Sequence, residues 1–158
     1  MVRHKLQWSD LFVLMGLDTS VLVDLILSTK AKEFFYGNVY QFEKNLIFTH
    51  RTCLGECLGL LIGNYGFSKE EARGKIQQFV DEFKVTILER EEDVGPDEQY
   101  VFNLGKKYGW SGDQIINDVI IITSFWRKGI NMVVVRDHIF EKVCRELKIT
   151  VLSFPLFT

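Results

Sequence analysis

The sequence predicts an α/β protein with a central parallel sheet of about five strands and helices on both faces. Short apolar runs alternate along the chain with stretches of helical periodicity, as in successive strand–helix units. The first run, residues 12–17, is apolar at every position rather than at every second one. This continuous pattern is typical of a strand that is covered on both faces, as strands of parallel sheets are.

Each expected strand is short and apolar, and the five strands occupy residues 12–17, 46–49, 85–88, 131–135 and 149–152. Asp18 follows the first strand and can cap the next helix through its side-chain oxygens. We expect Asp24 and Ser28 to face away from the core on this helix. Its inner stripe is expected to consist of Val21, Leu22, Leu25 and Ile26.

The second helix is expected at residues 30–44, and a small-residue helix follows the second strand at residues 53–61. In that helix Gly55 and Gly59 lie one turn apart. Because each glycine weakens a helix by about 1 kcal/mol, we expect close backbone approach to require them.

Capping boxes predict helix starts at residues 68–71 and 111–114. The second of these opens the most apolar helix, residues 115–126. Between them, the acidic segment 89–97 is typical of an exposed loop, and the helix after it is expected to end at Gly109.

The whole chain, residues 1–158, fits one domain, with residues 1–10 as a polar lead-in. The net charge of −2 argues against a protein that coats nucleic acid through bulk charge, but not against a nuclease. We expect a cytoplasmic protein without a membrane span, because the first ten residues lack an apolar signal segment and acids interrupt the longest apolar run.

Three cysteines, at positions 53, 57 and 144, form no disulfide framework, which indicates a reducing compartment. Cys53 and Cys57 stand four apart on the small-residue helix, but the three histidines are scattered. Small buried side chains are therefore the favoured interpretation of these cysteines over a zinc site.

Four acids share an unusual apolar or small-residue context: Asp18, Glu56, Asp118 and Asp137. Two of them follow predicted parallel strands, at the end where open α/β sheets place ligand sites. A pair of carboxylates about 4 Å apart costs roughly 4 kcal/mol at an effective dielectric constant of about 20. A divalent cation removes that cost, and oxygen ligands alone favour Mg²⁺ or Mn²⁺ over zinc.

At these acids the chain resembles the PIN-domain nucleases, and most closely the VapC-type toxin ribonucleases. The resemblance rests on four motifs in order: Leu17-Asp18-Thr19-Ser20-Val21-Leu22, Gly55-Glu56-Cys57-Leu58, Asn117-Asp118-Val119-Ile120-Ile121 and Val133-Val134-Val135-Arg136-Asp137-His138-Ile139-Phe140. It covers nearly the whole chain. It implies a three-layer α/β/α sandwich of the PIN-like kind and Mg²⁺- or Mn²⁺-dependent cleavage of RNA.

The resemblance also implies roles for individual residues. The four acids would be the catalytic metal-binding residues, with Thr19, Ser20 and Asn117 around them. Asp113 is either an outer member of the metal site or simply a favourable first-turn residue of a capped helix. Val135 departs from the family, which often has Ser or Thr there, and this puts one polar contact in doubt.

Four basic residues are candidates for gripping the RNA backbone: Arg136, Arg51, Arg127 and Lys128. For the last three, a solvated surface charge is an equally good interpretation. For His50 and His138, ordinary roles at helix starts are favoured over catalysis.

As a toxin, the protein would by resemblance form a homodimer and bind a small antitoxin. Aromatic residues of the second helix would suit such a partner surface or equally the core: Phe34, Phe35, Tyr36 and Tyr40. Two alternatives stay open, namely an RNA-processing nuclease outside a toxin–antitoxin pair and a non-catalytic binding module. A haloacid-dehalogenase-type phosphatase is disfavoured because Ser20 stands where its second Asp is needed, and the glycine loop of a Rossmann domain is missing.

Overall fold

The computed structural model describes residues 12–41, 44–111 and 115–157, and five strands within them form one sheet. The strand order is β3-β2-β1-β4-β5, and every neighbouring pair is parallel. The strands are β1 Val13–Leu17, β2 Asn45–His50, β3 Thr86–Leu88, β4 Met132–Val135 and β5 Thr150–Ser153. The predicted five-stranded parallel sheet is confirmed, and no strand begins or ends more than one residue from its predicted position.

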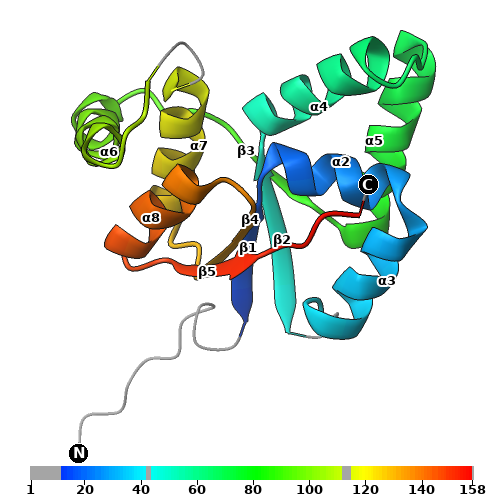
Figure 1. Cartoon of the computed structure of the whole chain (residues 1–158), viewed down its shortest axis with the longest axis horizontal. Helices are drawn as coiled ribbons and strands as arrows, with labels where there is room; N and C mark the ends of the chain where they lie inside the picture. Colours follow the sequence, from blue (N-terminus) through cyan, green and yellow to red (C-terminus); the bar gives the residue numbers. More distant parts are fainter. Residues whose placement is uncertain (1–11, 42–43, 112–114, 158) are drawn as a thin grey trace, which may run out of the picture.

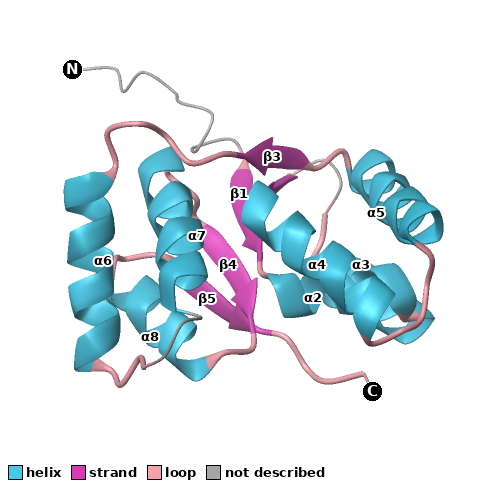
Figure 2. Cartoon of the chain, turned by 90° about the horizontal axis from the view of Figure 1, so that it is seen from above, coloured by secondary structure: helices cyan, strands magenta, loops and turns pink. Residues whose placement is uncertain are grey.

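Helices cover both faces of this sheet, as Figures 1 and 2 show. One layer consists of α2 (Thr19–Leu27), α3 (Thr29–Asn38), α4 (Arg51–Gly63) and α5 (Lys69–Phe83). The other consists of α6 (Gly95–Lys107), α7 (Ile115–Lys128) and α8 (His138–Glu146). The three-layer α/β/α arrangement is therefore confirmed.

The central strand β1 is buried because helices pack on both of its faces. Met15 and Leu17 are fully buried, and Gly16 lies against the ring of Phe125 from α7. A Cβ at Gly16 would stand 2.8 Å from that ring, so this position needs glycine. The continuous apolar pattern of the strand thus follows from close contact with a helix on the α7 side.

Several helix ends lie where the sequence places them. Ser68 and Glu71 form the predicted capping box at the start of α5, with two hydrogen bonds of 3.1 Å. After α6, Gly109 has a φ of 102°, which suits a glycine at a helix end. The second predicted capping box, at residues 111–114, falls partly outside the described residues.

The expectation that the second helix runs to residue 44 is wrong, because α3 ends at Asn38. The side-chain amide of Asn38 donates to the carbonyl of Phe34 at 3.0 Å and satisfies an acceptor of the last turn. The chain then turns so that Tyr40 stacks on Phe35 with ring centroids 5.5 Å apart. Both of these rings are buried, which assigns them to the core.

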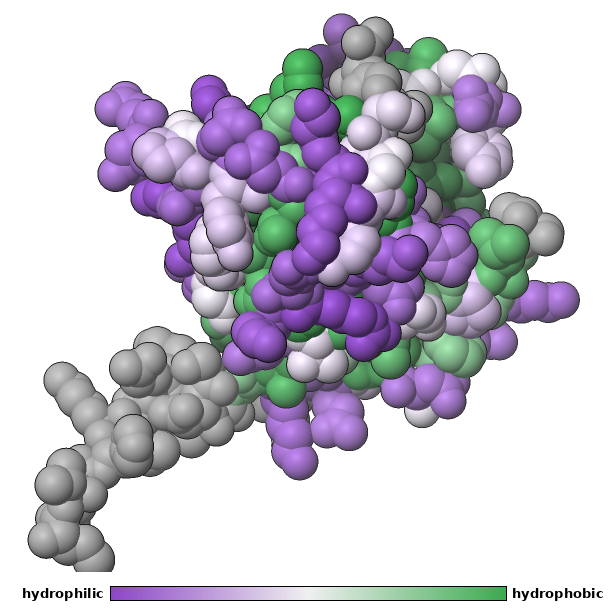
Figure 3. Space-filling view, turned by 60° about the vertical axis from the view of Figure 1, so that its left-hand side comes forward, coloured by the Kyte–Doolittle hydropathy of each residue, from purple (hydrophilic) through white to green (hydrophobic). Residues whose placement is uncertain are grey.

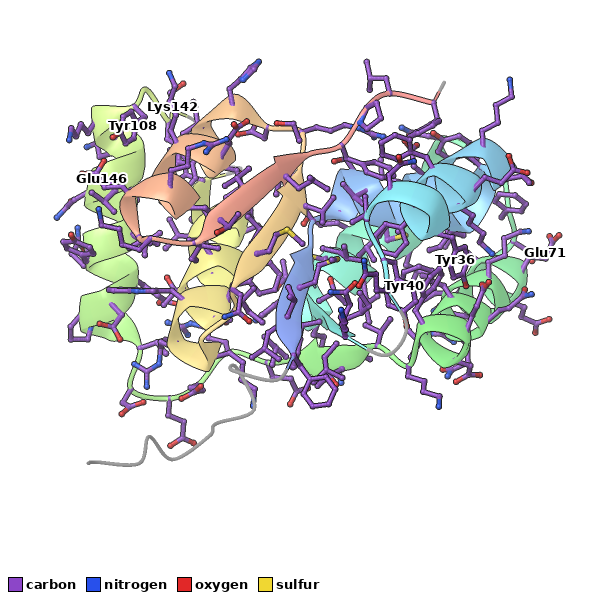
Figure 4. All side chains as sticks on the ribbon, turned by 90° about the horizontal axis from the view of Figure 1, so that it is seen from below. Tyr36, Tyr40, Glu71, Tyr108, Lys142 and Glu146 are labelled. Carbon is purple, nitrogen blue, oxygen red and sulfur yellow. The ribbon has the colours of Figure 1, made fainter. Side chains whose placement is uncertain are left out.

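The other two aromatics of α3 are less buried. Tyr36 is 47% exposed and donates to Glu82 of α5 at 3.2 Å. Figure 4 shows Tyr36 and Tyr40 on the same side of the molecule as α5. Phe34 is partly buried against Phe154, so only Tyr36 remains as a substantially exposed ring of this group.

Asp24 does not face away from the core, and this expectation is also wrong. The residue is only 6% exposed, and its carboxylate pairs with the guanidinium of Arg136 at the end of β4. Helical periodicity separates Asp24 from the apolar stripe of α2, but it does not show that a distant cation covers this side of the helix. Because Arg136 pairs with the carboxylate, Asp24 can be buried there. Ser28 is partly exposed and caps α3 by accepting from Ala31 at 3.1 Å.

The glycines of α4 are not explained by close approach of another backbone. A Cβ at Gly55 or at Gly59 would meet no atom within 4 Å, and both residues lie on an exposed face. The expectation of a close contact is therefore wrong among the residues that the structure describes. Close approach occurs instead at Gly105, where a Cβ would lie 1.6 Å from the ring of Trp110.

The face that carries α6 and α8 presents mainly hydrophilic side chains, with separate hydrophobic areas between them (Figure 3). At one end of this face Tyr108 donates to Glu146 of α8, and the ammonium of Lys107 lies 5.3 Å from the tyrosine ring (Figure 4). Within the described part of the chain, all helices are too short or too polar to cross a membrane.

Candidate active site

Three of the four predicted acids cap a helix or lie in its first turn beside the carboxyl edge of the sheet, and Glu56 lies one turn further along α4. Asp18 caps α2 directly after β1, and Asp137 caps α8 close to the end of β4. Glu56 belongs to α4 and Asp118 to the first turn of α7, one from each helical layer. Residues that are far apart in sequence thus approach one edge of one sheet (Figure 1).

Asp18 is held in place by the helix that it caps. Its Oδ1 accepts from the backbone N–H of Thr19 at 2.7 Å, and its own N–H donates to the carbonyl of Val134 at 3.4 Å. Burial raises the pKa of Asp18 from 3.8 to about 6, with repulsion from Glu56 and Asp137 adding to the effect. The protein therefore places this carboxylate where negative charge is unfavourable.

Asp118 is the more strongly perturbed acid, because it lies on the buried face of α7. Ile121, Ile122 and Phe125 follow it at helical spacing and are fully buried. Burial raises the pKa of Asp118 to about 7, and the charges of Asp18, Asp137 and Glu56 raise it further in that order. The charges of the other three acids therefore all reach Asp118.

Glu56, which is partly buried, and Asp137, which is exposed, are also oriented by hydrogen bonds. The hydroxyl of Thr19 donates to Glu56 Oε1 at 3.0 Å, across the boundary between α2 and α4. Asp137 Oδ1 accepts from the N–H of Phe140 at 2.8 Å, so this carboxylate also doubles as a helix cap. Thr19 thus orients Glu56 through its hydroxyl.

Carboxylate oxygens are the ligands that Mg²⁺ and Mn²⁺ prefer, so the donor chemistry of this cluster fits a hard divalent cation. Among the residues that the structure describes, no group of three or more Asp, Glu, His or Cys side chains is already arranged to hold a metal ion. Which acids bind a metal stays a prediction.

Other predicted site residues lie at varied depths. Asn117 and Ser20 are partly buried beside Asp118 and Asp18, whereas Asp113 lies outside the described residues. Val135 is fully buried inside the sheet and adds no polar group, although its family position often has a hydroxyl.

The four basic candidates occupy unequal environments. Arg127 pairs with three acids of the segment before and within α6, whereas Arg51 pairs with exposed Glu89. Lys128 is exposed. Arg136 is mostly buried and is engaged by several groups within the protein. Contact of any of these residues with RNA stays a prediction.

His50 fills the structural role favoured from the sequence, since its Nδ1 accepts from the N–H of Thr52 at 3.0 Å and caps α4. Its Nε2 is buried without a partner among the described residues. Burial raises the pKa of the Cys53 and Cys57 thiols to about 12, which agrees with small buried side chains rather than thiolate ligands.

The ion pair between Asp24 and Arg136 was missed. The sequence signal was a lone acid inside the apolar run of α2, the same signal that selected the other acids. The helical phase of Asp24 differs from the apolar stripe of Val21, Leu22, Leu25 and Ile26, so periodicity alone predicts an outward position.

Comparison with solved structures identifies the fold. VapBC2 from Rickettsia felis, bound to a DNA fragment from its promoter, matches with a TM-score of 0.68 and 15% identity over 90% of this chain and 99% of that chain. FitAcB from Neisseria gonorrhoeae matches with a TM-score of 0.60 and 15% identity over 87% and 95% of the two chains.

The sarcin–ricin loop cleaving toxin VapC20 from Mycobacterium tuberculosis matches with a TM-score of 0.58 and 17% identity, over 80% of this chain and 92% of that one. No family model and no curated protein matches the chain. With both chains covered almost completely in these superpositions, the chain has the PIN-like α/β/α fold that these structures share.

Proposed function

We propose that this protein is a Mg²⁺- or Mn²⁺-dependent endoribonuclease that hydrolyses RNA phosphodiester bonds, as the toxin of a type II toxin–antitoxin pair. The observation that carries the proposal is that burial, together with the charges of Asp18, Asp137 and Glu56, raises the pKa of Asp118 to about 7. Perturbed acids gathered at one edge of a sheet are typical of a functional site.

Each acid has a distinct part in this proposal. Asp18 and Asp118 would hold the cation most directly, because burial raises the pKa of both and a neutralising charge offsets that cost. Glu56 and Asp137 would complete the site from its more open side. When bound, the cation would lower the pKa of a water molecule and stabilise charge on the phosphate.

The remaining groups orient these acids and take no covalent part. Thr19 fixes Glu56 through its hydroxyl and Asp18 through its backbone N–H. The N–H of Phe140 fixes Asp137. Pre-oriented carboxylates of this kind lose little conformational entropy on binding a cation.

The toxin part of the proposal draws on the neighbours. One is a sarcin–ricin loop cleaving toxin, and others are structures of VapBC2 and FitAB bound to DNA fragments. We propose by analogy an RNA substrate, a small antitoxin partner and a homodimer for this chain.

The direct test is RNA cleavage with Mn²⁺ and with EDTA, comparing wild type with Asp18→Asn and Asp118→Asn. We expect metal-dependent cleavage by wild type and a loss of at least about 100-fold in each variant. Asp81→Asn, an exposed acid of α5 that accepts from Gln77, is the matched control and should cleave normally.

Metal-dependent cleavage that survives in both variants would overturn the proposed site. The toxin assignment has a separate test, in which the wild-type chain is expressed in a bacterial host. Growth arrest by wild type, and its absence with Asp118→Asn, is expected. Unimpaired growth at equal expression of active enzyme would instead favour an RNA-processing role.

A further inference from the structure

The side chain of Arg136 connects segments that are distant in the sequence. Its Nε donates to the carbonyl of Phe154 at 3.2 Å and its Nη1 to the carbonyl of Ser20 at 3.4 Å. Its Nη2 donates to the carbonyl of Pro155 at 2.6 Å and to the carboxylate of Asp24. Four of the five N–H groups of a guanidinium are thereby engaged within the protein.

This arrangement is buried rather than a surface ion pair. The side chain of Arg136 is 16% exposed and that of Asp24 is 8% exposed. The guanidinium also lies 5.3 Å from the ring of Phe154. An arginine with these partners has little capacity left for a phosphate, which separates it from exposed Lys128.

The segments that Arg136 joins carry two of the four acids. Arg136 immediately precedes Asp137, and Ser20 lies two residues after Asp18 in the first turn of α2. The segment after β5 crosses from the α8 side toward α2 and α3, where Arg136 holds its carbonyls (Figures 1 and 2). Arg136 thus adds side-chain hydrogen bonds to the backbone contacts that already join β4 to β1 and to the start of α2, among them that of the Asp18 N–H with the carbonyl of Val134.

We infer that Arg136, held by Asp24, is a positioning residue that sets the relation between the Asp18 and Asp137 carboxylates, and is not a contact to RNA. The inference rests on the proposed function, because it concerns the same four acids. Its chemistry is that of an outer partner that orients metal-binding groups without touching the cation. Loss of such partners typically weakens metal binding about 10- to 100-fold.

The test measures binding of Mn²⁺ alone, by electron paramagnetic resonance, to wild type, Asp24→Asn and Arg136→Lys. Asp24→Asn keeps the shape of the side chain and leaves the charge of Arg136 in place. We expect it to weaken Mn²⁺ binding about tenfold or more. Arg136→Lys keeps the charge but not the four hydrogen bonds, and should weaken binding similarly.

The matched control is Glu82→Gln, which removes a different ion pair, with Lys32, that joins α3 and α5. It should leave Mn²⁺ binding unchanged. If Asp24→Asn and Arg136→Lys both bind Mn²⁺ with wild-type affinity, the positioning role is overturned. If Arg136 instead bound RNA, Asp24→Asn would leave Mn²⁺ binding unchanged. It would also not weaken RNA binding, because Arg136 keeps its charge in this variant.

Hydrogen exchange of the metal-free protein separates this inference from the proposed function. The amides of Thr19 and Phe140 donate to Asp18 and Asp137 and report on the two caps. They should exchange faster in Asp24→Asn than in wild type and Glu82→Gln. Unchanged exchange overturns the positioning role, whereas a wild type that binds no Mn²⁺ overturns the proposed metal dependence instead.

Discussion

Replacing Asp118 by asparagine is expected to stabilise the metal-free protein while abolishing its activity. The pKa of Asp118 rises from 3.8 to about 7 in the folded chain. Because a difference of one in pKa corresponds to about 1.4 kcal/mol, its ionisation costs roughly 4 kcal/mol more in the folded chain than in the unfolded chain. A buried amide also loses hydration, so we expect a net gain of about 2 kcal/mol in unfolding free energy.

The pH dependence of this gain has a definite sign. The folded state holds the Asp118 proton more tightly than the unfolded state, so wild-type stability from this group rises as the pH falls from about 7 toward 3.8. The variant has no such group. The stabilisation should therefore be largest at pH 8 and absent at pH 4, where the folded wild type holds a protonated Asp118 and pays almost no ionisation cost.

Urea unfolding in EDTA at these two pH values measures the effect, with Asp81→Asn as the matched exposed control. That control should change stability by less than about 0.5 kcal/mol at either pH. The reasoning is refuted if Asp118→Asn is no more stable than wild type at pH 8, or if the gain persists at pH 4. With saturating Mn²⁺ the order should reverse, because only wild type gains binding free energy.

Two further predictions concern the frame around the acids. Gly105→Ala would place a Cβ 1.6 Å from the ring of Trp110, so thermal unfolding should show an unfolding free energy lower by about 3 kcal/mol or more. Gly59→Ala has open space around its Cβ and should raise the unfolding free energy by about 1 kcal/mol. Equal effects of the two substitutions would contradict the packing argument. Burial lowers the pKa of His50, so its NMR titration should occur below pH 6.5 and shift the Thr52 amide in the same step. The stability that neutral His50 contributes is complete above pH 6.5 and is lost as the pH falls through its folded pKa, and a titration at or above 6.5 would contradict this.

Local sequence determined most of the architecture. Continuous apolar runs marked β1 and β4 because these strands lie inside the sheet and are covered on both faces, whereas the edge strands β3 and β5 are partly exposed and carry Thr86, Thr150 and Ser153. Helix starts were also predictable, since Ser68 and Asp18 each act on backbone groups within three residues of themselves. The four acids stood out because carboxylates in apolar surroundings require a compensating partner.

Long-range contacts decided the rest. The burial of Asp24 depends on Arg136, which lies 112 residues away in the chain. The end of α3 depends on packing of Tyr40 against Phe35 and Phe83 from α5. Neither partner can be read from the local pattern, because helical periodicity describes one element and not its neighbours.

The acids themselves illustrate this division. Their residue types and their places after strands or inside helices follow from the sequence, because strand ends and helix caps are local features. The pKa of Asp118 near 7, which burial raises most and the other three acids raise further, arises only when β1, α4, α7 and α8 are brought to one edge of the sheet. Charge interactions act through space, so only the tertiary structure decides which carboxylates meet.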